Sequence, residues 1–272
     1  METVQTLDRK RAAGGFVSGG LIGILGGLIG LGGAEFRLPV LVGLFRLPTL
    51  QAIILNKAMS LVVVAVALMS RTMTISVAEL LPHLPVAGNL LAGSLVGAWW
   101  AAGHAIRMSR QTLDRVVMVL LVGLAVLMLS EAWFHLHQAG RPLFSYAPLQ
   151  FGVGLVAGFL IGVVAALLGV AGGELLIPTI VLLFGVDIKL AGSLSLIVSL
   201  PTMIVGFFRY RNSDAFSVLR AERYLATAMA GGSIVGAIIG GMLLGLVPTN
   251  LLISLLGVIL LISAIKTFQH SR

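Results

Sequence analysis

The sequence predicts an all-α polytopic membrane protein built from two internal repeats. The chain has 272 residues, of which 58% are hydrophobic and only 10% are charged, and its mean hydropathy is +1.07. A soluble protein of this length could not bury so much apolar surface. Charge-free runs long enough to cross a bilayer recur along the chain, and one glycine-rich pattern occurs twice.

The charge-free runs place the membrane helices, each of which needs about 20 residues. We expect helices at 15–31, 50–70, 80–103, 112–134, within 142–173, at 190–208, and two within 224–265 that part near 246–250. The apolar pieces 36–47 and 175–184 are short, so each either crosses the membrane or is re-entrant. We do not expect strands, because lipid admits only helices or closed barrels and these runs do not alternate in polarity. We expect about 8–10 helical segments.

Composition and charge exclude several classes of protein. A net charge of +8 would suggest nucleic-acid binding in a soluble protein, but here it belongs to loops that set membrane orientation, so we expect no nucleic-acid partner. The absence of cysteine excludes thiolate metal sites, and the histidines lack metal-binding spacing, so we expect neither a metal nor a cofactor. Residues 1–13 resemble the start of a signal peptide, but the glycine-rich run that follows lacks a cleavage site and recurs inside the chain.

An internal repeat organises the chain. Residues 15–42 match residues 154–181 at an offset of 139, with 12 of the 28 positions identical. The offset continues without a gap, so that Ser60 corresponds to Ser199. Paired repeats are the usual architecture of secondary transporters. We divide the chain into a cytoplasmic N-terminal segment (1–13), repeat 1 (14–134), a linker (135–148), repeat 2 (149–268) and a C-terminal tail (269–272).

Loop charge indicates that the repeats are inverted. Loop 209–223 carries four arginines and its counterpart near 71–79 carries one, whereas loop 104–115 carries three and its counterpart near 246–250 carries none. Basic loops face the cytoplasm, so we expect inverted repeats with both termini inside. A parallel arrangement gives a similar total of inside charges and is the alternative. Inversion requires an odd number of crossings in each repeat. Three spanning helices supply it if the first helix and the short piece form a hairpin, bent at the glycine turn, that adds no crossing or two.

The glycine turn that occurs in both repeats is the strongest candidate for a binding site. Glycines permit positive φ angles and a close approach of the backbone to a ligand. The helix that follows exposes unpaired N–H groups and the positive end of its dipole, which together attract anions. The alternative is that these glycines only allow close helix packing, as we expect for Gly15, Gly19 and Gly23. The substrate-binding candidates from the two turns are Gly30, Gly32, Gly33, Ala34, Gly169, Gly172 and Gly173.

The doubled motif, with Pro39 and Pro178 closing its two copies, resembles the TauE/SafE family of sulfite exporters. The resemblance covers both halves of the chain in order, at about the family's length. It implies a multi-helix inner-membrane protein that exports small anions such as sulfite, sulfoacetate or other organosulfur compounds. Family members often carry glycine where this chain has Ala34 and Ala171.

Polar residues inside the apolar spans are further candidates. Lys57 lies about seven residues into its helix, where burial of an ammonium group calls for a partner or a substrate. We predict that Lys57, with Asn56 and Ser60, attracts the anion; the alternative is snorkelling to the interface. Its counterpart in repeat 2 is leucine, so the site would be asymmetric. Ser195 and Ser199 are donor candidates from repeat 2, although serine in such helices often bonds the backbone.

The charged residues of the glycine turns have two interpretations. Glu35 and Glu174 each lie in the first turn of a short helix, where a carboxylate is stabilised by the helix dipole. The functional alternative is proton coupling, because a carboxylate beside an anion must be protonated to avoid repelling it. Arg37 either pairs with Glu35 or contacts the substrate.

Together these features predict a secondary transporter that exports a small sulfur-containing anion by alternating access, with the two halves of the chain rocking around the site. No nucleotide-binding motif is present, so gradients would supply the energy. An anion channel of the same architecture is the alternative. An enzyme is not expected, because we find no nucleophile–base pair or metal motif at membrane depth. The expected partners are the anion and membrane lipid, and the oligomeric state is not predicted.

Overall fold

A computed structural model of the chain describes residues 2–29, 33–72, 77–134, 143–144, 146–243 and 249–269. Within these ranges the chain is helical and contains no strand, as the sequence predicted. The elements are α1 (Glu2–Ile29), α2 (Ala34–Gly43), α3 (Thr49–Thr72), α4 (Val77–Leu80), η1 (Leu81–His83), α5 (Leu84–Ala105), α6 (Arg110–Phe134), α7 (Ala147–Leu168), α8 (Gly173–Phe184), α9 (Ile188–Tyr210), η2 (Asp214–Ser217), α10 (Val218–Ala221), α11 (Arg223–Met242) and α12 (Thr249–Gln269).

Six stretches of the described chain are long and apolar enough to cross a membrane. They are Thr49–Met69, Ala78–Ala105, Arg110–Ser130, Ala147–Leu168, Ile188–Tyr210 and Arg223–Gly240. The helices α2 and α8 have 10 and 12 residues. At 1.5 Å per residue they span about 15 and 18 Å, which is too short for a hydrocarbon core of about 30 Å. The two short apolar pieces of the sequence are therefore half-helices.

The helix boundaries follow the sequence repeat. Helices α2, α3, α5 and α6 begin at residues 34, 49, 84 and 110, and α8, α9, α11 and α12 begin 139 residues later, at 173, 188, 223 and 249. The predicted spans are correct to within a few residues, except that α1 begins at Glu2, so most of the segment 1–13 is helical. Most of the predicted linker and of the break near 246–250 lies outside the described residues.

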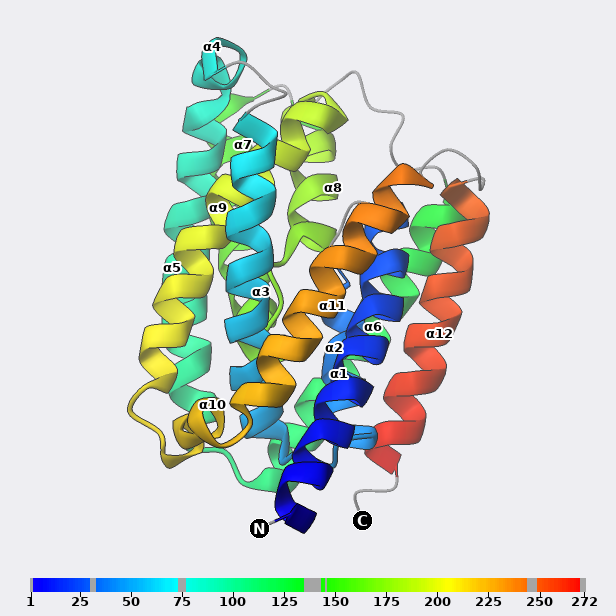
Figure 1. Cartoon of the computed structure of the whole chain (residues 1–272). Helices are drawn as coiled ribbons and strands as arrows, with labels where there is room; N and C mark the ends of the chain where they lie inside the picture. Colours follow the sequence, from blue (N-terminus) through cyan, green and yellow to red (C-terminus); the bar gives the residue numbers. More distant parts are fainter. Residues whose placement is uncertain are drawn as a thin grey trace.

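The two repeats run in opposite directions. Figure 1 shows α1 and α3 rising from the end of the molecule where both termini lie, whereas their counterparts α7 and α9 descend toward it. The half-helix α2 lies in the lower part of the view and α8 in the upper part. This antiparallel relation is the arrangement that alternating loop charge predicts.

Helices of the two repeats interlock through glycines. Helix α1 packs on α11, and in the symmetric position α5 packs on α7. A Cβ on Gly19 or Gly23 of α1 would clash with backbone carbonyl oxygens of α11, and a Cβ on the counterparts Gly158 or Gly162 of α7 would clash with carbonyl oxygens of α5. Such contacts let helix backbones touch. Each tight pair therefore combines one helix from each repeat.

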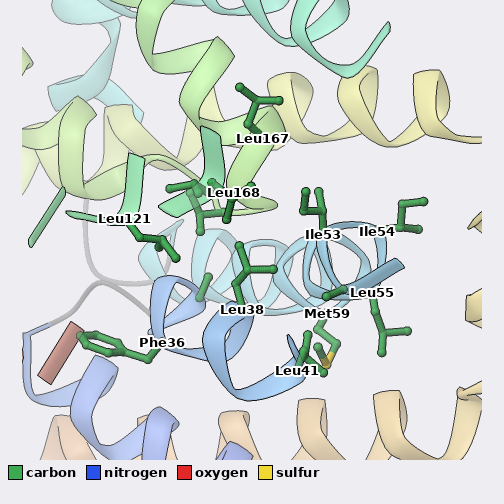
Figure 2. Packing of buried hydrophobic residues seen from close by; sticks show 14 of the residues in the cluster. Phe36, Leu38, Leu41, Ile53, Ile54, Leu55, Met59, Leu121, Leu167 and Leu168 are labelled. Atoms are coloured by element: carbon green, nitrogen blue, oxygen red, sulfur yellow. The ribbon is translucent and has the colours of Figure 1, made fainter. Parts of the chain in front are cut away.

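The half-helix α2 lies inside the bundle. It packs on α1, α3 and α12, and its residues are apolar around most of the helix circumference, as is typical of a buried helix. Figure 2 shows Leu38 of α2 among Leu121 of α6, Leu168 of α7 and the side chains of α3. This packing holds the N-terminal turn of α2 away from lipid.

Candidate functional site

The glycine turns have the backbone conformation that their sequence predicts. Gly33 precedes α2 with φ 69°, and Gly172 precedes α8 with φ 80°. Gly169, which follows α7, has φ 68°, and a Cβ there would lie 2.5 Å from the carbonyl oxygen of Ile53. These glycines are required for positive φ and for close packing alike. Gly30 and Gly32 lie outside the described residues.

Helix α3 brings the two turns together. The side-chain amide of Asn56 donates one hydrogen bond to the carbonyl oxygen of Ala34 (2.9 Å) and another to that of Leu168 (3.1 Å). Ala34 is the first residue of α2, and Leu168 is the last residue of α7. One buried side chain therefore links the turn of repeat 1 to the turn of repeat 2.

The two glutamates of the turns meet in the interior. Glu35 is fully buried and Glu174 is only 4% exposed. Their carboxyl groups are close enough to interact by charge. Neither carboxyl accepts a hydrogen bond from a donor in the part of the chain that the structure describes. Over the same residues, no group of three or more metal-ligating side chains gathers at one place. The inverted repeats thus contribute one carboxyl each to a buried pair.

Arg37 is the cation beside this pair. It is 1% exposed, and its Nη2 donates a hydrogen bond to Ser60 Oγ at 2.7 Å. Its remaining donors, Nε and Nη1, have no hydrogen-bond partner among the described residues. Its counterpart is Leu176, so the guanidinium makes the site asymmetric.

The two serines of repeat 2 differ in their bonding. Ser195 donates to the carbonyl oxygen of Gly192 in its own helix at 2.8 Å, which is the backbone role that serine often takes in membrane helices. Ser199 is 1% exposed, and its hydroxyl has no partner within the described ranges. Ser199 is therefore the available donor of the two.

Lys57 occupies a different place from Arg37. Its side chain is fully buried, so it does not extend to the aqueous interface. Its Nζ donates to the carbonyl oxygen of Ala165 near the end of α7 at 3.1 Å. A Cβ on Gly206 of α9 would lie 3.1 Å from this nitrogen. The ammonium is enclosed between α3, α7 and α9.

Sequence reasoning missed Tyr210. Its side chain is fully buried at the end of α9, and its hydroxyl donates to the carbonyl oxygen of Ala166 at 3.0 Å. A single tyrosine at a helix end is typical of the aromatic belt at the interface, so no sequence signal distinguishes its role.

Comparison with known proteins agrees with this architecture. Searches of curated proteins and of solved structures found no match. A family model described as sulfite exporter TauE/SafE matches residues 3–129 and 130–272. The two matches divide the chain near the boundary between the repeats. The chain therefore belongs to the TauE/SafE sulfite exporter family and is a multi-pass membrane transport protein.

Proposed function

We propose that this protein exports a small sulfur-containing anion, such as sulfite or sulfoacetate, across the bacterial inner membrane, with both termini in the cytoplasm. The observation that carries the proposal is the buried guanidinium of Arg37, two donors of which have no hydrogen-bond partner among the described residues. We assign the protein no enzymatic activity.

An oxyanion suits the guanidinium of Arg37. Guanidinium groups form strong, charge-assisted hydrogen bonds with oxyanions. Ser60 accepts a hydrogen bond from the guanidinium. We propose its counterpart Ser199, whose buried hydroxyl has no partner among the described residues, as a further donor to the anion. The N-termini of α2 and α8 add the positive ends of two helix dipoles. When a proton neutralises the neighbouring carboxyl pair, the buried Arg37 loses negative charge beside it, and the anion would supply the counter-charge that a buried cation needs.

The carboxyl pair gives the site a means of proton coupling. If Glu35 and Glu174 both carry negative charge, they repel an incoming anion. A proton bound at the pair removes this repulsion, so the anion and the proton bind cooperatively. We propose that these two residues carry the coupled proton.

The interlocked helices suggest which parts move during alternating access. The sequence predicts that its two halves rock against each other, but α1 packs tightly on α11, and α5 on α7. Each of these pairs contains a helix from both halves. The pairs are joined through α3 and α9, which pack on each other. We propose that the moving bodies are the α1–α11 and α5–α7 pairs.

Transport itself is tested with purified protein in liposomes. A carrier should give saturable sulfite flux, and liposomes loaded with unlabelled sulfite should transiently accumulate radiolabelled sulfite by exchange. Liposomes containing the Arg37→Gln variant provide the control. Rapid flux that does not saturate and shows no exchange would instead support the channel, whereas absence of sulfite flux would remove sulfite as the substrate.

The identity of the moving bodies is tested by distances between spin labels. The chain has no cysteine, so cysteines that carry spin labels can be introduced two at a time at exposed positions. The four positions are the counterparts Leu21 and Leu160, which are 61% and 56% exposed, and the counterparts Val96 and Val235, which are 61% and 47% exposed. With and without sulfite between pH 5.5 and 8, we expect the Leu21–Val235 and Val96–Leu160 distances to stay constant. The Leu21–Val96 and Leu160–Val235 distances, each within one repeat, should shift. The reverse pattern would show that the sequence halves move as bodies.

A further inference from the structure

The end of α7 presents a problem that the fold must solve. The last four carbonyl groups of any α-helix lack partners within that helix. In α7 these are the carbonyls of residues 165–168, immediately before the turn that leads to Glu174. At membrane depth no bulk water can satisfy them, and an unsatisfied buried carbonyl destabilises the fold.

Three side chains from two neighbouring helices satisfy three of these four carbonyls. Lys57 Nζ donates to the carbonyl of Ala165 (3.1 Å), and the Tyr210 hydroxyl donates to that of Ala166 (3.0 Å). The Asn56 amide donates to the carbonyl of Leu168 (3.1 Å). All three donor side chains are fully buried. The ammonium group also lies at the negative end of the α7 dipole, where a cation is stabilised.

We infer that Asn56, Lys57 and Tyr210 are positioning residues that hold the C-terminal end of α7, and with it the turn 169–173 and Glu174, in place. This inference rests on the proposed function and refines it, because Lys57 then stabilises the C-terminal end of α7 instead of binding the anion. Arg37 is then the cation available to the anion.

The repeat supports a role specific to α7. The counterparts of Asn56 and Lys57 are Ser195 and Leu196. Leucine has no donor, and Ser195 bonds to its own helix. Helix α9 therefore has no side-chain donors that correspond in role to Asn56 and Lys57 of α3. Different side chains thus stabilise the two glycine turns. Replacing Lys57 should therefore change the structure mainly at the second turn, residues 169–173.

Hydrogen exchange tests the inference without requiring transport. Lys57→Met removes both donor and charge, Lys57→Gln keeps a donor without charge, and Tyr210→Phe removes only the hydroxyl. We expect amides of residues 169–176 to exchange about tenfold faster in Lys57→Met and Tyr210→Phe. Lys57→Gln should lie closer to the wild type. The exposed residues Lys189 and Tyr146 supply the matched controls Lys189→Met and Tyr146→Phe, which should leave this segment unchanged.

Sulfite binding supplies the second readout. If the hydrogen bonds to the α7 carbonyls position the site, Lys57→Met and Tyr210→Phe should weaken sulfite binding to a similar extent. Lys57→Gln, which keeps a donor, should weaken it less. Equal losses of binding in Lys57→Gln and Lys57→Met, with Tyr210→Phe unaffected, would overturn the inference in favour of direct anion binding by Lys57. Unchanged exchange in both Lys57→Met and Tyr210→Phe would also overturn it. If the wild type does not bind sulfite, the proposed substrate fails, and the exchange rates alone still decide the inference.

Discussion

Replacing Arg37 by glutamine should weaken sulfite binding about 100-fold, because truncating one member of a buried, hydrogen-bonded charge pair typically costs about 2–5 kcal/mol. Glutamine keeps a hydrogen-bond donor for Ser60 but removes the charge and the two guanidinium donors that have no partner within the described ranges. Isothermal titration of the purified variant with sulfite measures the effect. Arg37→Lys keeps the charge but loses the planar donor set, so its affinity for sulfite should lie between those of the wild type and Arg37→Gln.

Two controls make the Arg37 result specific. Arg211 is exposed at the end of α9, and Arg211→Gln should bind sulfite with wild-type affinity. Circular dichroism and size-exclusion profiles of Arg37→Gln should match those of the wild type. The protein folds without the anion, and glutamine can still donate a hydrogen bond to Ser60. A correctly folded Arg37→Gln protein that binds sulfite as tightly as the wild type would refute the role of Arg37.

Replacing both Glu35 and Glu174 by glutamine should abolish the pH dependence of sulfite transport. In the wild type, the protonated pair accepts the anion, so affinity should fall as pH rises, by up to about tenfold per pH unit for one coupled proton. Glutamine mimics the protonated carboxyl group at every pH. Sulfite itself exchanges a proton with water in this range, so uptake is compared at equal concentrations of the doubly charged species. Measured in this way between pH 5.5 and 8, with no imposed potential, uptake should vary by about twofold or less in the double variant.

Single variants show whether the two carboxyls act as a pair. Interacting carboxyl groups titrate together rather than independently, so Glu35→Gln and Glu174→Gln should each alter the pH profile, and their combined effect should not be additive. Glu79 is exposed, and Glu79→Gln serves as the matched control with a wild-type profile. A double variant with the pH profile of the wild type would exclude proton coupling through these residues.

Much of the architecture could be predicted from the sequence because bilayers impose strong one-dimensional constraints. Hydropathy and length locate spanning helices, and the offset of 139 that joins Gly33 to Gly172 also joins the starts of α3 and α9. Loop charge predicted the antiparallel relation of the repeats. The same constraints made Glu35, Glu174 and Arg37 visible as charges in apolar surroundings.

The sequence by itself determined that this is a two-repeat membrane transport protein with a doubled glycine turn and a few charges at membrane depth, because periodicity, length and charge are properties of the chain alone. Only the tertiary structure decided how those charges are used: Lys57 bonds to the end of α7, whereas Arg37 keeps two donors unpaired among the described residues. It also paired α1 with α11 and α5 with α7. The reason is that hydrogen bonds and backbone contacts depend on which helices become neighbours, and these neighbours are far apart in the chain.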